Sequence, residues 1–189
     1  MTEDNCKKVY AGWRDQGLIP SEASRLKRYN KEFDEIFSSD LRRCVETAKL
    51  LFPNRTHREM RELREIHFGE WEGFTYEELK SNASYQQWIS DFENRKPPNG
   101  ESLAAFRFRI FRGWNKVMSV NKGNRIAIIT HSGVIREFLT AYAPEIRNPW
   151  DWTVPHGGGF ELIFEVKELR RGARCTLLQE VPSPENGDG

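Results

Sequence analysis

The sequence predicts an α/β fold, because two of its segments read as a buried strand followed by a turn and an amphipathic helix. In the first, residues 33–38 (FDEIFS) form a short strand pattern, and residues 40–52 carry apolar side chains at helical spacing. In the second, residues 126–129 (IAII) end just before His131, and another helical pattern follows at once. Ligands of open α/β sheets bind at the carboxyl ends of the strands, so we expect a site where these two strands end.

The composition is that of a globular protein with a polar surface: 189 residues, 38% hydrophobic and 30% charged. A net charge of +1 provides no global field for nucleic acid or an anionic membrane, and no apolar run approaches the roughly 20 residues needed to span a bilayer. The three cysteines, at positions 6, 44 and 175, have no metal-ligand spacing, which favours reduced thiols in a cytoplasmic protein. We expect one domain over residues 1–181 and a disordered tail over residues 182–189.

The first half of the chain contains several shorter features. Residues 1–18 are polar and turn-rich, and residues 21–29 suit a short helix. At the turn into the helix over residues 40–52, the adjacent Ser38, Ser39 and Asp40 offer N-caps. Residues 62–73 (ELREIHFGEWEG) mix apolar and acidic side chains and end in glycine, which indicates a loop along the edge of the site.

The second half begins with a polar helix predicted over residues 75–91 and a rigid break over residues 96–100 (KPPNG). A long helix with one apolar stripe follows over residues 102–119. The arginines interleaved with that stripe are interpreted as a solvated face: Arg107, Arg109 and Arg112. Strands over residues 160–166 and 175–181 suit a hairpin with its turn at residues 170–172.

Polar groups gather where the two strand–helix units end. Arg43 lies in the first turn of one helix, His131 precedes the other, and Glu65 and Glu70 lie in the loop between them. Arginine binds phosphate oxygens in a bidentate manner, helix N-termini attract anions, and a carboxyl group can protonate a leaving oxygen. The pattern therefore points to phosphoryl chemistry.

Four ordered segments make the chain resemble the histidine phosphatase superfamily, the phosphoglycerate mutase-like enzymes. Residues 38–48 (SSDLRRCVETA) are similar to that family's SSxLxRAxxTA segment, and residues 62–73 to its LxExxFGxWEG segment. Residues 97–102 (PPNGES) match PPxGES, and residues 130–133 (THSG) match THxG. The resemblance implies a three-layer α/β/α sandwich with a mostly parallel sheet, and it is strongest to the α-ribazole phosphatase and broad-specificity phosphatase branch.

The resemblance also implies roles for individual residues. Arg43 would hold the phosphoryl group, His131 would stabilise it during transfer, and Glu65 would donate a proton to the leaving group. Asn5 ends a segment similar to the family's RHGxTxxN motif and would contact phosphate. Ser132 is a further expected substrate contact, and the chemistry needs neither a metal nor a cofactor. Apart from the resemblance, His156 precedes three glycines that let the backbone approach a ligand closely, so it either contacts substrate or stands in a flexible loop.

The chain departs from the family pattern at its start. The family's nucleophile is the histidine of Arg-His-Gly at the end of the first strand, and Met1 aligns just after that glycine. The first strand is thus expected to be missing, with Met1 an internal methionine of a longer protein; upstream codons lacking such a strand would contradict this. We expect a hydrolase of a small phosphorylated metabolite, with its activity impaired by the missing histidine.

Two alternative functions stay open at this point. One is a non-catalytic pseudoenzyme that binds phosphorylated ligands. The other is a mutase-type phosphotransferase, although such an enzyme needs a longer insert than residues 75–97 offer. The oligomeric state is also open, including a homodimer in which a partner supplies the missing strand.

Overall fold

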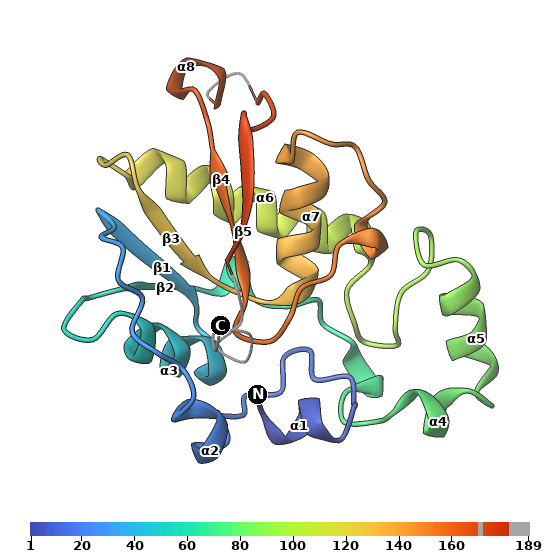
Figure 1. The fold of residues 1–189 in the computed structure, drawn as a ribbon. Helices are drawn as coiled ribbons and strands as arrows, with labels where there is room; N and C mark the ends of the chain where they lie inside the picture. Colours follow the sequence, from blue (N-terminus) through green and yellow to red (C-terminus); the bar gives the residue numbers. More distant parts are fainter. Residues whose placement is uncertain (170–171, 182–189) are drawn as a thin grey trace. The chain divides into compact units, whose positions relative to one another are not determined.

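The structure is a computed structural model that describes residues 1–169 and 172–181. It contains two compact units, Met1–His131 and Ser132–Gly189 (Figure 1). The expected single domain over residues 1–181 stays a prediction, and the expected tail over residues 182–189 lies outside the described residues.

A three-stranded parallel sheet forms the centre of the first unit. Its strands are β1 (Glu35–Ser39), β2 (Arg58–Met60) and β3 (Ile126–Ile129), in the order β2-β1-β3. The predictions for β1 and β3 are confirmed, with β1 shifted along the chain. Strand β2 was not predicted, because its three residues (REM) show no apolar alternation and join the sheet through backbone pairing to β1.

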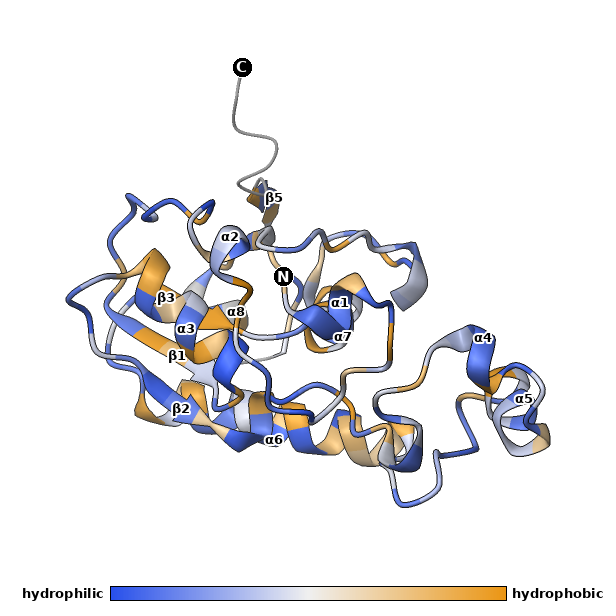
Figure 2. Cartoon of the chain, turned by 90° about the horizontal axis from the view of Figure 1, so that it is seen from below, coloured by the Kyte–Doolittle hydropathy of each residue, from blue (hydrophilic) through white to orange (hydrophobic). Residues whose placement is uncertain are grey.

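Helices cover both faces of this sheet. On one face, Ile36 and Ala127 pack with Phe52, which directly follows α3 (Arg42–Leu51). On the other face, Phe37 packs with Val117 of α6 (Leu103–Val120). Successive strand residues point to opposite faces, so this alternation produces three layers, and Figure 2 shows α3 and α6 on opposite sides of the strands. The predicted α/β/α layering is confirmed for this unit.

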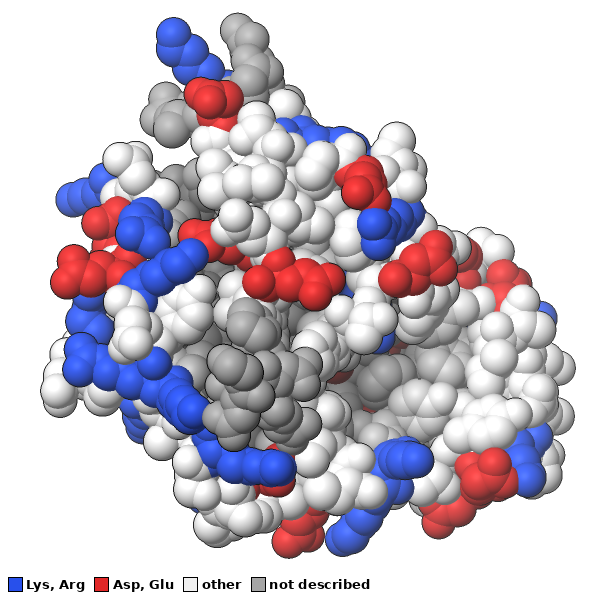
Figure 3. Space-filling model, viewed as in Figure 1, with Lys and Arg blue, Asp and Glu red and all other residues white. Residues whose placement is uncertain are grey.

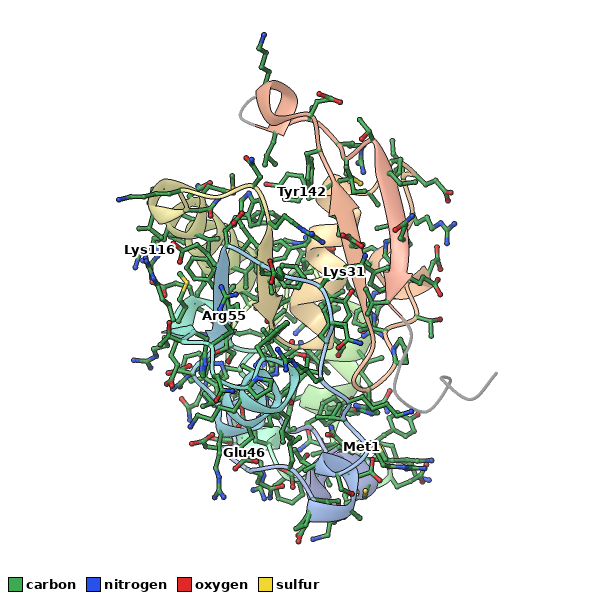
Figure 4. The ribbon with its side chains drawn as sticks, turned by 60° about the vertical axis from the view of Figure 1, so that its left-hand side comes forward. Met1, Lys31, Glu46, Arg55, Lys116 and Tyr142 are labelled. Atoms are coloured by element: carbon green, nitrogen blue, oxygen red, sulfur yellow. The ribbon has the colours of Figure 1, made fainter. Side chains whose placement is uncertain are left out.

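The amino-terminal segment carries the short helices α1 (Glu3–Cys6) and α2 (Pro20–Ala23) and is tied to α3. The Leu18 N–H donates to the Glu46 carboxylate at 2.7 Å, and Figure 4 shows Glu46 at the same end of the unit as Met1. The predicted helix over residues 21–29 is wrong beyond α2. The residues after α2 are mainly basic and polar, with few apolar side chains to hold a helix against the core.

The segment between β2 and α6 is built from short elements: η1 (Arg61–Leu63), η2 (Gly69–Trp71), α4 (Tyr76–Leu79) and α5 (Ala83–Ser90). The single helix predicted over residues 75–91 is thus wrong. Asn82 interrupts it, because its side chain accepts the Tyr85 N–H and caps α5. A buried aromatic cluster around Trp71, Tyr85 and Trp88 holds these short helices together.

The second unit contains α7 (Ser132–Tyr142), η3 (Pro149–Asp151), β4 (Gly159–Ile163), α8 (Val166–Leu169) and β5 (Leu177–Val181). The two strands pair antiparallel, as the hairpin prediction expected, and their apolar side chains pack with Leu139 and Trp152. Of the predicted turn, residues 170–171 lie outside the described residues. In the described part of the chain, the structure shows no helix with the length and apolar character to cross a membrane.

Candidate active site

Parallel pairing of β1 with β3 brings the two predicted strand ends together. Ser38 is in register with Ile129, so the residues that follow each strand leave the same edge of the sheet (Figure 1). Arg43 then comes from the first turn of α3, and His131 directly follows Thr130. The Arg43 Nε–H donates to His131 Nδ1 at 3.3 Å, which makes this pair the centre of the candidate site.

The start of α3 differs from the prediction. Its N-cap residue is Leu41, and none of the expected cap side chains bonds the helix end. Ser39 Oγ instead accepts the Leu41 N–H at 3.3 Å. Asp40 binds the Arg64 guanidinium through both oxygens at 2.7 Å, so its carboxylate forms an ion pair with the neighbouring loop. That ion pair raises the pKa of Arg64, mainly through the hydrogen bond with Asp40.

Two backbone carbonyls orient the Arg43 guanidinium. Gly12 and Arg14 each accept one of its N–H groups at 2.8 Å. With the bond to His131, three of the five guanidinium N–H groups have partners in the described part of the chain. The remaining donors are of the kind that binds phosphate oxygens.

His131 is neutral and held in one tautomer. Its side chain is buried; burial, followed by the positive charges of Arg43, Arg109 and Arg64, lowers its pKa well below the usual value. Because a guanidinium has only donors, Nδ1 must accept from Arg43, and the ring proton is on Nε2. Nε2 lies 2.9 Å from Ser39 Oγ, which accepts that proton.

Cys44 completes this buried cluster without being a nucleophile. Its sulfur lies 3.5 Å from His131 Nε2 and donates to the Thr130 carbonyl at 3.6 Å. Burial raises the pKa of the Cys44 thiol to about 12, opposed by the charge of Arg43 and reinforced by that of Glu65. The thiol therefore stays protonated, and the negative charge of Glu65 contributes to that rise.

Glu65 lies on the loop between η1 and η2, as the sequence predicts. Its Oε1 accepts the following Ile66 N–H at 3.0 Å. The competing acids of this loop are bound elsewhere, since Glu62 pairs with Lys116 of α6 and Glu70 is exposed and accepts from Asn99. Among these three acids, Glu65 is the one whose charge acts on the His131 cluster.

The other predicted contacts take different positions. Asn5 closes the capping box of α1, where its Oδ1 accepts the backbone N–H and the hydroxyl of Thr2. Its amide N–H₂ is the group that an anion would need. Ser132, the first residue of α7, and His156, exposed in a loop, belong to the second unit. Their roles stay predictions.

Sequence reasoning missed three residues around the site: Ser39, Trp13 and Arg109. The interpretation of Arg109 as part of a solvated face is wrong. Its side chain is only 12% exposed and pairs with Glu101, which is 16% exposed. The sequence feature that could have indicated this pair is the PPNGES segment. Its glutamate, Glu101, precedes Arg109 by 8 residues, or about two helical turns, so the two side chains can meet.

The electrostatics of the described residues agree with a small anionic ligand. Within those residues no group of three or more His, Cys, Asp and Glu side chains is arranged to hold a metal ion. On the face seen in Figure 3, lysines and arginines are interspersed with acidic residues. The positive charges that act on His131 are those of Arg43, Arg109 and Arg64.

Comparisons with known proteins found a matching family and similar chains. The model of the histidine phosphatase superfamily (branch 1) matches residues 1–168. The adenosylcobalamin/alpha-ribazole phosphatase of Salmonella typhimurium is 28% identical over 169 residues, covering 82% of each chain. The crystal structure of a phosphoglycerate mutase from Thermus thermophilus is 36% identical, with a TM-score of 0.61 over 77% of this chain and 81% of that one.

A further solved structure shares the fold along the whole chain. The alpha-ribazole phosphatase from Shigella flexneri matches 100% of this chain and 95% of its own, with a TM-score of 0.83 at 24% identity. At that identity the likeness shows the fold alone, and it agrees with the predicted phosphoglycerate mutase-like architecture.

Proposed function

Because this chain belongs to the histidine phosphatase superfamily, we propose that it hydrolyses a small phosphomonoester. The observation that carries the proposal is the contact between Arg43 and His131 at the carboxyl edge of a parallel sheet, with the charge of Glu65 acting nearby. The name of the Salmonella relative favours a substrate of the alpha-ribazole phosphate kind. Three free cysteines, at positions 6, 44 and 175, fit the proposed cytoplasmic location.

In the proposed reaction, Arg43 binds two oxygens of the phosphoryl group through its remaining N–H donors. As charge develops on a third oxygen, neutral His131 turns its Nε2–H from Ser39 Oγ to that oxygen. Water attacks the phosphorus as the ester P–O bond breaks, the carboxyl of Glu65 protonates the departing oxygen, and the resulting carboxylate accepts the proton of the water. Asn5, Ser132 and His156 are proposed substrate contacts. Arg43 and His131 thus stabilise charge, and Glu65 transfers a proton. Catalysis of phosphoryl transfer consists mainly of positioning and charge stabilisation.

A second candidate function is binding without turnover. None of the four histidines in the sequence stands in the Arg-His-Gly context of the family's nucleophile. A chain of this sequence would then bind a phosphorylated ligand through Arg43 and His131 and leave it intact. The likeness to a phosphoglycerate mutase also keeps phosphoryl transfer to a second hydroxyl as an alternative reaction.

The test measures turnover and binding together. The chain is incubated with 4-nitrophenyl phosphate from acidic to neutral pH, with and without an alcohol acceptor, and free phosphate is measured; vanadate affinity is measured by calorimetry. Phosphate release that disappears in His131→Asn supports the hydrolase, and release that survives it contradicts the role of His131. Vanadate binding without release favours the binder, and a phosphorylated acceptor favours the transferase.

Arg43→Lys tests the phosphate contact, with Arg42→Lys as its matched control. The Arg42 side chain is 66% exposed and pairs with Glu46 on the surface of the same helix. Losing one charged hydrogen bond of about 1.5–3 kcal/mol should weaken vanadate binding roughly 10- to 100-fold in Arg43→Lys. Equal affinities of the two variants would contradict the proposed contact.

A further inference from the structure

The guanidinium of Arg109 donates to the Glu101 carboxylate and to backbone carbonyls of the segment that follows β2. Its Nε and Nη2 each donate to a Glu101 oxygen at 2.7 Å. The other N–H groups donate to three carbonyls of the segment that follows β2: Glu62 at 2.9 Å, Arg64 at 3.0 Å and Glu65 at 3.0 Å. A single side chain of α6 thereby fixes the backbone that carries Glu65.

Glu101 and its neighbours brace the same loop from the far side. The Glu101 carboxylate accepts the His67 N–H at 3.0 Å, and its own N–H donates to the His67 carbonyl at 2.9 Å. Gly69, at a φ of 56°, touches the turn of the PPNGES segment so closely that a Cβ would lie 2.0 Å from the Pro98 carbonyl oxygen. The PPNGES segment therefore supports the loop through Arg109 and through direct backbone contact.

The backbone carbonyl of Glu65 also binds Trp13, which belongs to a third segment of the chain. The Trp13 Nε1–H donates to this carbonyl oxygen at 2.8 Å, and Arg109 donates to the same oxygen. The ring stacks on His67 at 4.6 Å, and the Arg64 guanidinium lies 5.0 Å from its centroid. These contacts order the indole, so the direction of its N–H is set.

The position of Trp13 links the two halves of the candidate site. The carbonyls of its neighbours, Gly12 and Arg14, are those that hold the Arg43 guanidinium. The short segment 12–14 therefore contacts the phosphate-binding arginine through its backbone and the Glu65 loop through the indole. A shift of this segment would therefore change the distance between Arg43 and the Glu65 loop.

We propose that Trp13 and Arg109 are positioning residues for Glu65, with Glu101 holding Arg109 in place. This rests on the proposed function, in which Glu65 protonates the leaving group. A general acid must lie within about 2.6–3.2 Å of the oxygen it protonates, and a misplacement of about 1 Å costs on the order of 100-fold in rate. The two hydrogen bonds to the Glu65 carbonyl hold the backbone of this residue in place, and neither donor has to contact the substrate.

The activity test compares two substrates. 4-Nitrophenyl phosphate releases a stable anion and needs little proton donation, whereas glycerol phosphate releases an alkoxide that must be protonated. We expect Trp13→Phe and Arg109→Lys to follow Glu65→Gln, with a loss in kcat/KM of about 10- to 100-fold for glycerol phosphate and little change for the nitrophenyl ester. Vanadate affinity should not change, because the Arg43 contacts remain.

Arg112→Lys is the matched control, because Arg112 lies on the same helix, is 56% exposed and approaches Glu62 only to 3.8 Å. It should hydrolyse both substrates like the parent chain. Equal losses for both substrates in Trp13→Phe and Arg109→Lys, with weakened vanadate binding, would indicate a general structural role and overturn the proposal. So would unchanged kinetics in both variants.

Hydrogen exchange separates failure of this proposal from failure of the proposed function. If the parent chain hydrolyses neither ester, the hydrolase proposal fails, and the loop contacts are then judged by amide exchange over residues 61–67. Faster exchange in Glu101→Gln than in Arg112→Lys, at equal vanadate affinity, supports the positioning of the loop by Arg109. Identical exchange in the two variants overturns it.

Discussion

The Nε of Arg43 lies 3.3 Å from Nδ1 of His131, so a charged side chain donates to a buried imidazole. Burial and the nearby arginines hold the pKa of His131 well below its ordinary value of 6.5, and the folded protein keeps the ring neutral. The unfolded chain binds a proton near pH 6.5 that the folded chain does not bind. The stabilising effect of neutral His131 is therefore present above that pH and is lost as the pH falls.

The resulting prediction concerns stability against pH. The free energy of unfolding, from urea titrations between pH 8 and pH 5, should fall more steeply below pH 6.5 in the parent chain than in His131→Asn. The contribution of this one group is at most about 1.4 kcal/mol per pH unit. Parallel pH profiles for the two proteins would show that His131 titrates normally.

Adjacent serines of β1 provide a matched pair. Both are fully buried, but Ser39 accepts from His131, while the Ser38 hydroxyl has no partner in the described part of the chain. Ser39→Ala should cost about 1–3 kcal/mol, because it leaves the Nε2–H unpaired, whereas Ser38→Ala should be close to neutral. Chemical denaturation measures both. A larger loss in Ser38→Ala would contradict the hydrogen-bond assignment.

The Asp40–Arg64 ion pair should couple measurably. Both side chains are about three-quarters buried (25% and 22% exposed) and meet through two hydrogen bonds, so a double-mutant cycle with Asp40→Asn and Arg64→Gln should give about 1 kcal/mol. The exposed pair of Glu3 and Lys7 is the reference, with a coupling of about 0.3 kcal/mol or less. Similar coupling in both pairs would mean that solvent screens Asp40 fully.

Two glycines at positive φ separate backbone strain from steric overlap. A Cβ at Gly172, at a φ of 74°, meets none of the described residues within 4 Å, whereas one at Gly69 meets the Pro98 carbonyl. Gly172→Ala should therefore cost about 1 kcal/mol, and Gly69→Ala about 2 kcal/mol more. Thermal unfolding of the two variants provides the comparison, and equal losses would show that the loop relaxes at no cost.

Thiol reactivity should distinguish the three cysteines. Cys6 is exposed, whereas Cys44 and Cys175 are buried and burial raises the pKa of each thiol. Titration with a chromogenic disulfide should label one thiol rapidly in the native chain and the other two only after unfolding. Rapid labelling of Cys44, located by peptide mapping, would show that the buried cluster opens under native conditions.

The accuracy of the sequence predictions depended on how far apart the interacting residues lie along the chain. Strands β1 and β3 and helices α3, α6 and α7 follow from apolar periodicity, because each buries one face against the core. The polar elements were predicted less well. The helix predicted over residues 75–91 is interrupted at Asn82, and β2 lacks any pattern of its own.

For the candidate site, the sequence by itself determined which groups are available for the proposed chemistry: an arginine and a histidine at two strand ends, and a glutamate in the loop between them. Only the tertiary structure decided how these groups are held. Parallel pairing of β1 with β3 brings Arg43 to His131, and the bond between them selects the histidine tautomer. The bonds from Trp13 and Arg109 to Glu65 join residues 52 and 44 positions apart, a separation over which no periodicity can show contact.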